Sequence, residues 1–151
     1  MQHGRWLLNR SANPNAQDKE FGWTPQHLAA NDGHVEISRL LLQYKADSNA
    51  RDLSGWTPLI YASEQGHVTV AQALLEHGAD VTAQAIVCDA PLHHASRSGY
   101  LEVARLLVEH GANIKAEGDM GKTAFQVASE KGHLDVAKFL TDHASKQENI
   151  L

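Results

Sequence analysis

The side chains of this 151-residue chain that could bind a metal or act as a nucleophile are ten histidines and one cysteine. Cys88, His93 and His94 form the single local cluster of such groups, with the spacing Cys-x4-His-His. A structural zinc site needs a full set of ligands, and a nucleophilic cysteine needs a base, an orienting group and an oxyanion loop. No second cysteine exists, and no such loop and no phosphate-binding glycine loop is recognisable. We therefore expect no metal site, no cofactor and no enzymatic activity.

The charge and the cysteine content limit the partners and the location of the protein. The chain has 13 basic and 18 acidic residues and a formal net charge of −5, which disfavours nucleic acid or an anionic membrane as the main partner. It contains no apolar run long enough for a membrane span or a signal peptide. With one cysteine no disulfide can form within the chain, and we expect an intracellular location, cytoplasmic or nuclear.

Most of the histidines occupy fixed positions in an internal repeat. The glycines that mark the period recur every 33 residues, at Gly33, Gly66, Gly99 and Gly132. Three histidines directly follow this glycine, at His34, His67 and His133. His77 and His110 precede the glycine that ends the second half of a copy, where an imidazole can meet the last helix carbonyls. A partial copy over residues 5–16 comes before the full ones.

Each copy is expected to form two short helices. Thr57 can cap a first helix and Pro58 suits its first turn, whereas Gly66 ends it because glycine adopts the left-handed conformation without steric cost. The second helix of this copy, about residues 68–76, is apolar over too wide an arc for a helix with a single buried side. Such helices need neighbours on two sides, and stacking of the copies supplies them.

These patterns resemble the ankyrin repeat. The matching segments are Thr24-Pro25-x-His27, Thr57-Pro58-Leu59, Pro91-Leu92-His93, Gly78–Ala83 and Gly111–Ala116, within a resemblance over about residues 5–145. The resemblance implies an all-α ankyrin-repeat solenoid of stacked helix-turn-helix units with β-hairpin fingers. It also implies that His27 and His93 hydrogen-bond the repeat threonine and nearby backbone. One array is expected over residues 1–151, with a half repeat at 1–17, full repeats at 18–50, 51–83 and 84–116, and a C-terminal capping repeat at 117–151.

The same resemblance implies a non-enzymatic scaffold that holds a protein partner on the concave surface of its fingers and first helices. The candidate contact residues flank the finger glycine or precede the helix-ending glycine: Phe21, Trp23, Leu53, Trp56, Tyr61, Ile86, Val87, Asp89, His94 and Arg97. Trp23 and Trp56 are one repeat apart and should lie side by side as anchors of binding. Alternatively, each packs on the next finger and only stiffens the array. Trp6 is expected in the core or a cap, and the chain is expected to be a monomer.

Two other origins of such an array stay open. The chain could be an ankyrin targeting module cut from a larger effector or enzyme chain, because it begins inside a repeat, although residues 121–133 are typical of a C-terminal cap. It could also be an engineered ankyrin binder, because its spacing is regular, although divergent motifs such as Thr-Pro-Gln-His favour natural divergence. The sequence does not identify the partner.

One copy has lost the residues that shape the finger of its neighbour: Asp52, Gly55 and Thr57 are replaced by Ala85, Cys88 and Ala90. Losing the glycine forces Cys88 either into a left-handed conformation, which costs about 1–2 kcal/mol, or into a different turn. Losing the helix cap costs about 1 kcal/mol, and losing the turn aspartate removes a side chain that bonds the turn backbone. We expect this third finger to depart from the hairpin shape of the second and to bury Ile86 and Val87 partly. Either the finger was shaped for a partner, or drift was tolerated because the other repeats hold the array.

Overall fold

The computed structural model describes residues 13–150, without the side chain of Ile150. Trp6, and with it most of the expected half repeat at residues 1–17, lies outside these residues. None of the helices in the described part combines the length and the apolar character that a membrane span requires.

The helices of the described residues occur in pairs that follow the sequence period. The first helices of the pairs are α2 (Pro25–Asp32), α4 (Pro58–Gln65), α6 (Pro91–Ser98) and α8 (Ala124–Glu130). The second helices are α3 (Val35–Gln43), α5 (Val68–Glu76), α7 (Leu101–Glu109) and α9 (Leu134–Ile150). A short 3₁₀ turn, η1 (Asp119–Gly121), precedes α8.

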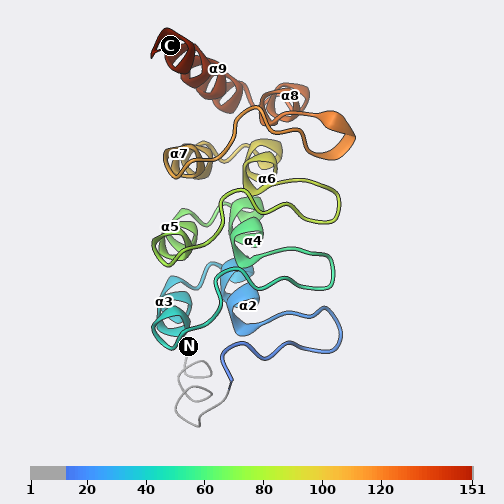
Figure 1. The fold of residues 1–151 in the computed structure, drawn as a ribbon, viewed down its shortest axis with the longest axis vertical. Helices are drawn as coiled ribbons and strands as arrows, with labels where there is room; N and C mark the ends of the chain where they lie inside the picture. Colours follow the sequence, from blue (N-terminus) through green and yellow to red (C-terminus); the bar gives the residue numbers. More distant parts are fainter. Residues whose placement is uncertain (1–12, 151) are drawn as a thin grey trace.

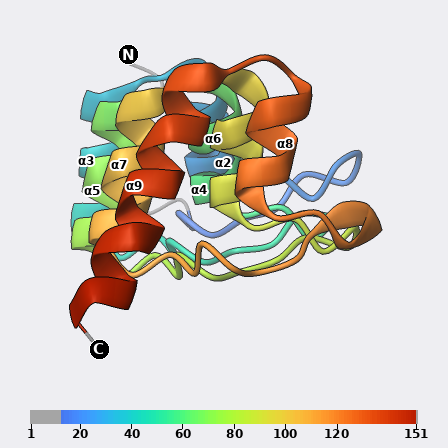
Figure 2. The ribbon, with the colours of Figure 1, turned by 90° about the horizontal axis from the view of Figure 1, so that it is seen from above.

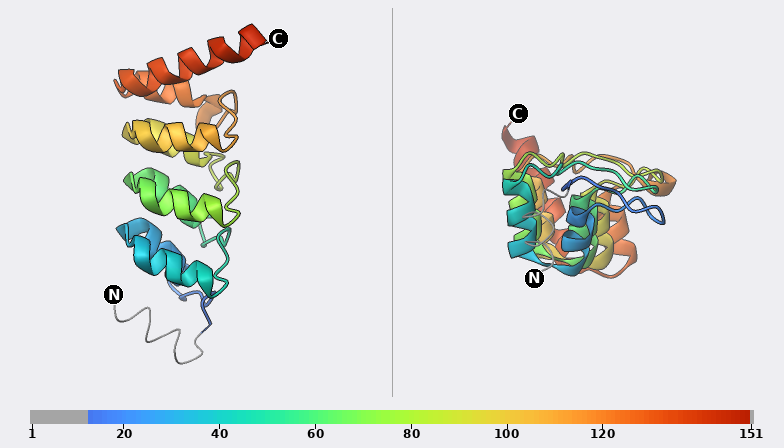
Figure 3. Two further views of the ribbon diagram at one scale, coloured as in Figure 1. Left: turned by 90° about the vertical axis from the view of Figure 1, so that its left-hand side faces the viewer. Right: turned by 90° about the horizontal axis from the view of Figure 1, so that it is seen from below.

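The pairs stack along one axis into an all-α solenoid, as the sequence predicts. Figure 1 shows the first helices in one column and the second helices in a neighbouring column, with the loops between successive pairs all extending from the same side. Seen from above in Figure 2, these loops reach well beyond the column of first helices. Figure 3 shows the same stack from the side of the second helices. Each repeat therefore contacts mainly the repeats before and after it.

The connecting loops are the fingers of the array. We define the first finger as residues 18–23, the second as 51–56, the third as 84–89 and the fourth as 117–122. Each is closed by a backbone hydrogen bond between its two arms, such as that from Asp52 N–H to the Trp56 carbonyl at 3.0 Å. Residues 13–150 contain no β-strand. The expected β-hairpins are therefore present as closed turns, because the arms share too few hydrogen bonds to form a ladder.

The local sequence explains where the first helices begin and end. The Thr57 hydroxyl accepts the backbone N–H of Ile60 at the start of α4, at 3.3 Å. Gly66 ends the same helix with a φ of 77°, in the left-handed region that glycine enters without a Cβ clash. The second helices end in the same left-handed turn at Gly78 and Gly111, whereas Lys45 adopts it without that advantage, at a φ of 65°.

The core lies between the two columns of helices. Leu59 of α4, Leu74 of α5 and Leu107 of α7 are completely buried. Burying a side chain of this size favours folding by about 1.5–3 kcal/mol relative to leaving it in water. The wide apolar arc of the second helices is used as expected, because α5 contacts the helices of the repeats on both sides of it.

Histidines of the described repeats hydrogen-bond the backbone, either of the next repeat or at the end of their own helix. The Nε2–H of His27 donates to the Trp56 carbonyl of the next repeat at 2.9 Å, while its Nδ1 accepts the Thr24 N–H at 3.0 Å. Burial lowers the pKa of His27, in keeping with a neutral ring held in this tautomer. His77 and His110 donate from Nδ1 to the carbonyls of Ala73 and Leu106 at 2.9 Å, which confirms their predicted place at helix ends.

Candidate functional site

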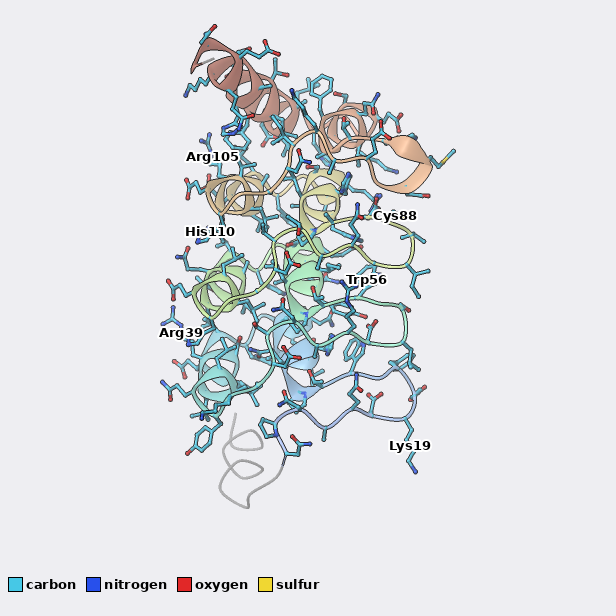
Figure 4. The ribbon with its side chains drawn as sticks, in the orientation of Figure 1. Lys19, Arg39, Trp56, Cys88, Arg105 and His110 are labelled. Atoms are coloured by element: carbon cyan, nitrogen blue, oxygen red, sulfur yellow. The ribbon has the colours of Figure 1, made fainter. Side chains whose placement is uncertain are left out.

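The fingers and the first helices together form one exposed surface, which we call the finger face. It consists of the exposed side chains of the four fingers and of α2, α4, α6 and α8. In Figure 4, Lys19, Trp56 and Cys88 lie on the finger side of the molecule, whereas Arg39, Arg105 and His110 lie on the side of the second helices. Variants at the second group can therefore serve as controls for variants on the finger face.

Four aromatic side chains form a continuous strip across the first two repeats of this face. The aromatic strip consists of Phe21, Trp23, Tyr61 and Trp56, whose successive ring centroids are 6.0, 5.1 and 4.8 Å apart. The rings are tilted or edge-on to one another, which is the arrangement that aromatic quadrupoles favour. Trp23 and Trp56 thus share one surface, and each contacts Tyr61.

Tyr61 holds the strip together through its hydroxyl group. The hydroxyl donates to the Asp52 carboxylate and accepts the Nε1–H of Trp23 at 3.1 Å. Burial raises the pKa of Tyr61, and the neighbouring Asp52 carboxylate raises it further. The hydroxyl therefore stays protonated and keeps donating to Asp52, which fixes the three aromatic rings in one arrangement.

Asp52 orders the second finger from inside the turn. Its Oδ1 accepts the backbone N–H groups of Ser54 and Trp56, both at 2.9 Å. Asp18 has the same role in the first finger, where its Oδ1 accepts the N–H groups of Phe21 at 2.8 Å and Gly22 at 2.9 Å. The hydrogen bond from Phe21 and those from the following residues hold the pKa of Asp18 below its usual value. Both fingers therefore present their aromatic residues from a turn that is already ordered.

His94 continues the strip underneath the second finger. Its ring centroid lies 4.6 Å from that of Trp56, and its Nδ1 lies 2.5 Å from Glu64 Oε2. The hydrogen bond from His94 is the main reason that the pKa of Glu64 is lowered, so this carboxyl group stays ionised. The His94 side chain is only 2% exposed, and its Nε2 meets no hydrogen-bond partner among the described residues.

The third finger keeps the shape of the second, so the expected departure from that shape is wrong. The Ala85 N–H donates to the Asp89 carbonyl at 3.1 Å and the Cys88 N–H to the Ala85 carbonyl at 2.8 Å, as at the same places in the second finger. Cys88 adopts a φ of 68°, close to the 78° of Gly55. The cysteine thus accepts a left-handed conformation that costs about 1–2 kcal/mol. The stack of neighbouring fingers holds it there.

The tip of the third finger is exposed, so its expected partial burial is also wrong. Ile86 is 72% exposed and Val87 53% exposed. The tip rests on the second finger, since the Ile86 N–H donates to the Ser54 carbonyl at 3.4 Å. Hydrogen bonding to the neighbouring finger thus fixes the backbone and leaves the apolar side chains in solvent.

Asp89 and Arg97 have a structural role that the sequence analysis missed. Asp89 Oδ2 lies 2.5 Å from Arg97 Nη2, and Asp89 Oδ1 accepts the Asp119 N–H of the fourth finger at 2.8 Å. Burial raises the pKa of Asp89, but the Asp119 N–H and the Arg97 guanidinium outweigh it, and the net pKa is lowered. An aspartate in the position of Trp56, followed by an arginine eight residues later, is the sequence signal of this bridge.

The predicted contact residues therefore divide into two groups. The exposed or half-buried ones are Phe21, Trp23, Leu53, Trp56, Tyr61, Ile86, Val87 and Arg97. Asp89 and His94 are 2% exposed, so the structure places these two beneath the surface, where they support other residues.

Met120, at the tip of the fourth finger, is 82% exposed and belongs with the apolar tips. Glu64 is a further half-buried residue of the face, and the ring of His94 joins it to Trp56.

The cysteine and histidines considered for metal binding do not converge. Cys88 is exposed at the third finger tip, whereas His93 is buried and bonded at both ring nitrogens. Its Nδ1 accepts the Ala90 N–H at 3.1 Å and its Nε2–H donates to the Ala116 carbonyl at 3.1 Å, as the repeat pattern implies. In residues 13–150 no three side chains of His, Cys, Asp or Glu are grouped as metal ligands would be.

Comparison with known proteins adds two findings. The sequence matches the family model for ankyrin repeats (three copies) over residues 2–85 and 87–150. It is also similar to the 2-5A-dependent ribonuclease of Mus musculus, with 44% identity over 45 residues. That stretch is 30% of this chain and 6% of the relative, so the chain spans only a small fraction of the relative's length.

Proposed function

Because the chain belongs to the ankyrin-repeat family, we propose that it is a non-enzymatic, monomeric scaffold that holds a protein partner on its finger face. Ankyrin repeats are in general protein-interaction modules. The aromatic strip supports placing the contact surface on the finger face. The stretch shared with the ribonuclease is too short a part of that protein to bring its activity to this chain.

The aromatic strip is the observation that supports this function most strongly. Phe21 is 54% exposed, and Trp23, Tyr61 and Trp56 are each half-buried. Tryptophan and tyrosine are the usual anchors of protein interfaces, because they present a large apolar area with few rotatable bonds. The contacts around Tyr61 and Asp52 order the rings before any partner arrives, which reduces the entropy lost on binding.

The apolar finger tips extend the same surface along the array. Each finger has at least one strongly exposed apolar residue at its tip: Phe21, Leu53, Ile86 with Val87, and Met120. Large apolar side chains gathered in one row on a protein surface mark interaction sites more often than isolated ones do. A partner that lies across the fingers would cover this row and the aromatic strip together.

The experiment that tests this function compares two faces of the molecule. The purified chain, immobilised, captures proteins from a lysate, and each captured protein is then produced and its affinity measured for three forms of the chain. These forms are the unchanged chain, Trp56→Ala on the finger face, and Arg39→Ala on the exposed side of α3. We expect Trp56→Ala to weaken binding by at least about 30-fold, and Arg39→Ala to leave it unchanged.

Circular dichroism of the variants separates a lost contact from a lost fold. A partner that binds Trp56→Ala as tightly as the unchanged chain, but loses affinity for Arg39→Ala, would place the contact surface on the second helices and contradict the proposal.

A further inference from the structure

The half of the finger face that carries the aromatic strip is acidic. Residues 18–32 and 51–65 contain five acidic side chains and two basic ones. One of the basic ones, Arg51, is held at the base of the second finger, where Nη1 donates to the carbonyls of Gly55 at 3.1 Å and Gln84 at 2.8 Å. Its guanidinium is thus occupied between two fingers, and Lys19 is the other basic side chain of these two segments.

Within residues 13–150, the acidic groups beside the aromatic strip lack a lysine or arginine partner, although Glu64 is bonded to the ring of His94. Among the described residues, neither Asp52 nor Glu64 forms an ion pair with a lysine or an arginine. The other half of the face is different, because Asp89 is paired with Arg97 there and Glu130 is paired with Lys122 at 2.7 Å. Glu117 and Asp119 have no ion pair within the described part of the chain either, but residues 84–98 and 117–131 contain four acidic and three basic side chains, so the larger net negative charge lies on the half of the face that carries the aromatic strip.

Glu64 is the acidic group best placed to meet a partner. It lies one helical turn after Tyr61 on α4, and it is hydrogen-bonded through Oε2 to His94, whose ring packs against Trp56. Its side chain is 33% exposed, and its pKa is lowered by the hydrogen bond from His94 and by the charge of Arg97, which is itself committed to Asp89. An ionised carboxylate thus lies one helical turn from Tyr61 and is joined through His94 to Trp56, and both of these rings are partly exposed.

Aromatic rings and an ionised carboxylate near them together favour one kind of ligand group. A cation over the face of tryptophan or tyrosine is attracted by the ring quadrupole, and a carboxylate next to the ring adds a direct ion pair. A guanidinium fits both better than an ammonium does, because it is planar, stacks on rings and is less strongly hydrated. A phosphorylated or acidic segment would instead meet like charge on this half of the face.

We infer that the aromatic strip, with Glu64 beside it, docks an arginine side chain that the protein partner presents between apolar residues. The guanidinium stacks on the tryptophan and tyrosine rings and pairs with Glu64, while the apolar neighbours of the arginine cover the exposed tips Phe21 and Leu53. This inference rests on the proposed function and specifies the chemistry of the partner at that surface.

The test uses a peptide that carries only the inferred features. The probe is acetyl-Leu-Gly-Arg-Gly-Leu-amide, with matched peptides in which lysine or the neutral isostere citrulline replaces the arginine. Each is titrated into the ¹⁵N-labelled full chain at low ionic strength, and the indole N–H signals of Trp23 and Trp56 are followed by NMR. We expect saturable shifts of these signals with the arginine peptide, at least about tenfold weaker binding with citrulline, and intermediate binding with lysine.

Two variants assign the charge effect to one carboxyl group. Glu64→Gln keeps a side-chain oxygen that can accept from His94, and we expect it to weaken the arginine peptide by at least about fivefold. Glu109→Gln, at an exposed position of α7, removes the same charge far from the strip and is expected to leave the affinity unchanged. Equal affinity for the arginine and citrulline peptides, or equal losses in the two variants, would overturn the inference.

The affinity of a captured partner for these variants distinguishes a failure of this inference from a failure of the proposed function. If a captured protein partner depends on Trp56 but binds Glu64→Gln as tightly as the unchanged chain, the finger face is the binding surface and the docking of an arginine is wrong. If the partner depends on neither residue, the proposed function fails as well.

Discussion

The second and third fingers have nearly the same backbone and very different side chains. In the second finger, Asp52 lies inside the turn and bonds the N–H groups of that same turn. In the third finger, Asp89 lies on the returning arm and bonds Arg97 and the N–H of Asp119 in the next finger. One finger is ordered by its own residues, and the other is ordered mainly by its neighbours.

This difference shows that stacking can impose a finger shape that the local sequence does not favour. The Leu53 N–H donates to the Phe21 carbonyl, and the Ile86 N–H donates to the Ser54 carbonyl, so each finger is bonded to the one before it. A Cβ at Gly55 would lie 3.3 Å from Ile86 Cγ1, which shows how closely the two fingers are packed. The third finger thus keeps its shape although Cys88 has replaced the turn glycine.

The same difference divides the finger face chemically. Around the second finger, the carboxylates of Asp52 and Glu64 are bonded to Tyr61 and His94 and have no lysine or arginine partner among the described residues, whereas around the third finger the buried carboxylate of Asp89 is paired with an arginine. Asp89 occupies the place in the third finger that Trp56 occupies in the second. The third finger therefore has a structural ion pair where the second has an aromatic ring that we propose as a binding anchor. We expect affinity for a partner to come mainly from the first two repeats.

The largest effect on stability is expected at Asp52. Asp52→Ala leaves the hydroxyl of Tyr61 and two backbone N–H groups without their acceptor, and hydrogen bonds to charged groups contribute about 1.5–3 kcal/mol. Urea unfolding should show a loss of about 3 kcal/mol, with Glu109→Ala on the exposed side of α7 as the control. A loss below about 1 kcal/mol would mean that the second finger, like the third, is held mainly by its neighbours.

Asp89 should contribute less than Asp52 to the free energy of unfolding at neutral pH. This contribution should be lost in acid. Its folded-state pKa is lowered, so its stabilising effect is present above the unfolded pKa of about 4 and is lost as the pH falls through the folded pKa. Asp89→Asn should therefore lower the free energy of unfolding by about 2 kcal/mol at pH 7 and flatten its decline below about pH 4.

The measurement is urea unfolding across this pH range, with Asp47→Asn on an exposed loop as the matched control. An acid-induced decline as steep in Asp89→Asn as in the unchanged chain would contradict the assigned ion pair.

Reciprocal exchanges at the turn should have opposite signs. Cys88→Gly removes the left-handed strain and should stabilise the chain by about 1 kcal/mol, whereas Gly55→Ala introduces it and should destabilise by about 1–2 kcal/mol. Gly55→Ala also brings the new Cβ against Ile86, which must shift slightly. Thermal unfolding of the two single variants checks this pair, and no gain from Cys88→Gly would show that the third turn is unstrained.

The smallest effect is expected at the start of α6. Ala90 lacks the hydroxyl with which Thr57 accepts a backbone N–H at the equivalent place in α4. His93 still bonds the Ala90 N–H, so half of the capping arrangement survives. Ala90→Thr should stabilise the chain by about 0.5–1 kcal/mol, as measured by urea unfolding. A destabilised variant would indicate that the buried Ala90 site has no room for the hydroxyl.

The fold could be predicted from the sequence because its signals are local and recur. Each signal specifies one feature of a repeat: Thr57 begins a helix, Gly66 ends it, and the apolar arc of residues 68–76 needs neighbours on two sides. Because these signals recur, the repeats must stack. The shape of the third finger could not be predicted in this way. It depends on the Ser54 carbonyl and on Arg97, which lie in another finger and on a helix, and the turn residues alone carry no sign of these contacts.

The two tryptophans of the candidate site could be picked out from the sequence, but the contacts that hold them in place could not. Trp23 and Trp56 stand out because they recur at one repeat spacing. The role of Tyr61 as the ring that both tryptophans contact depends on its bond to Asp52, nine residues earlier, and this pairing follows from the path of the finger. The hydrogen-bond partner of His94 likewise lies outside its own repeat, because Glu64 belongs to the preceding one.

The most direct test of the account is to ask which tryptophans a bound protein partner touches. The indole N–H signals of the ¹⁵N-labelled chain, assigned with tryptophan-to-phenylalanine variants, are recorded with and without a captured partner. The account predicts that the signals of Trp23 and Trp56 shift or broaden on binding, together with amide signals of the first and second fingers. Unchanged signals from both tryptophans, with changes confined to the amides of α5 and α7, would contradict it.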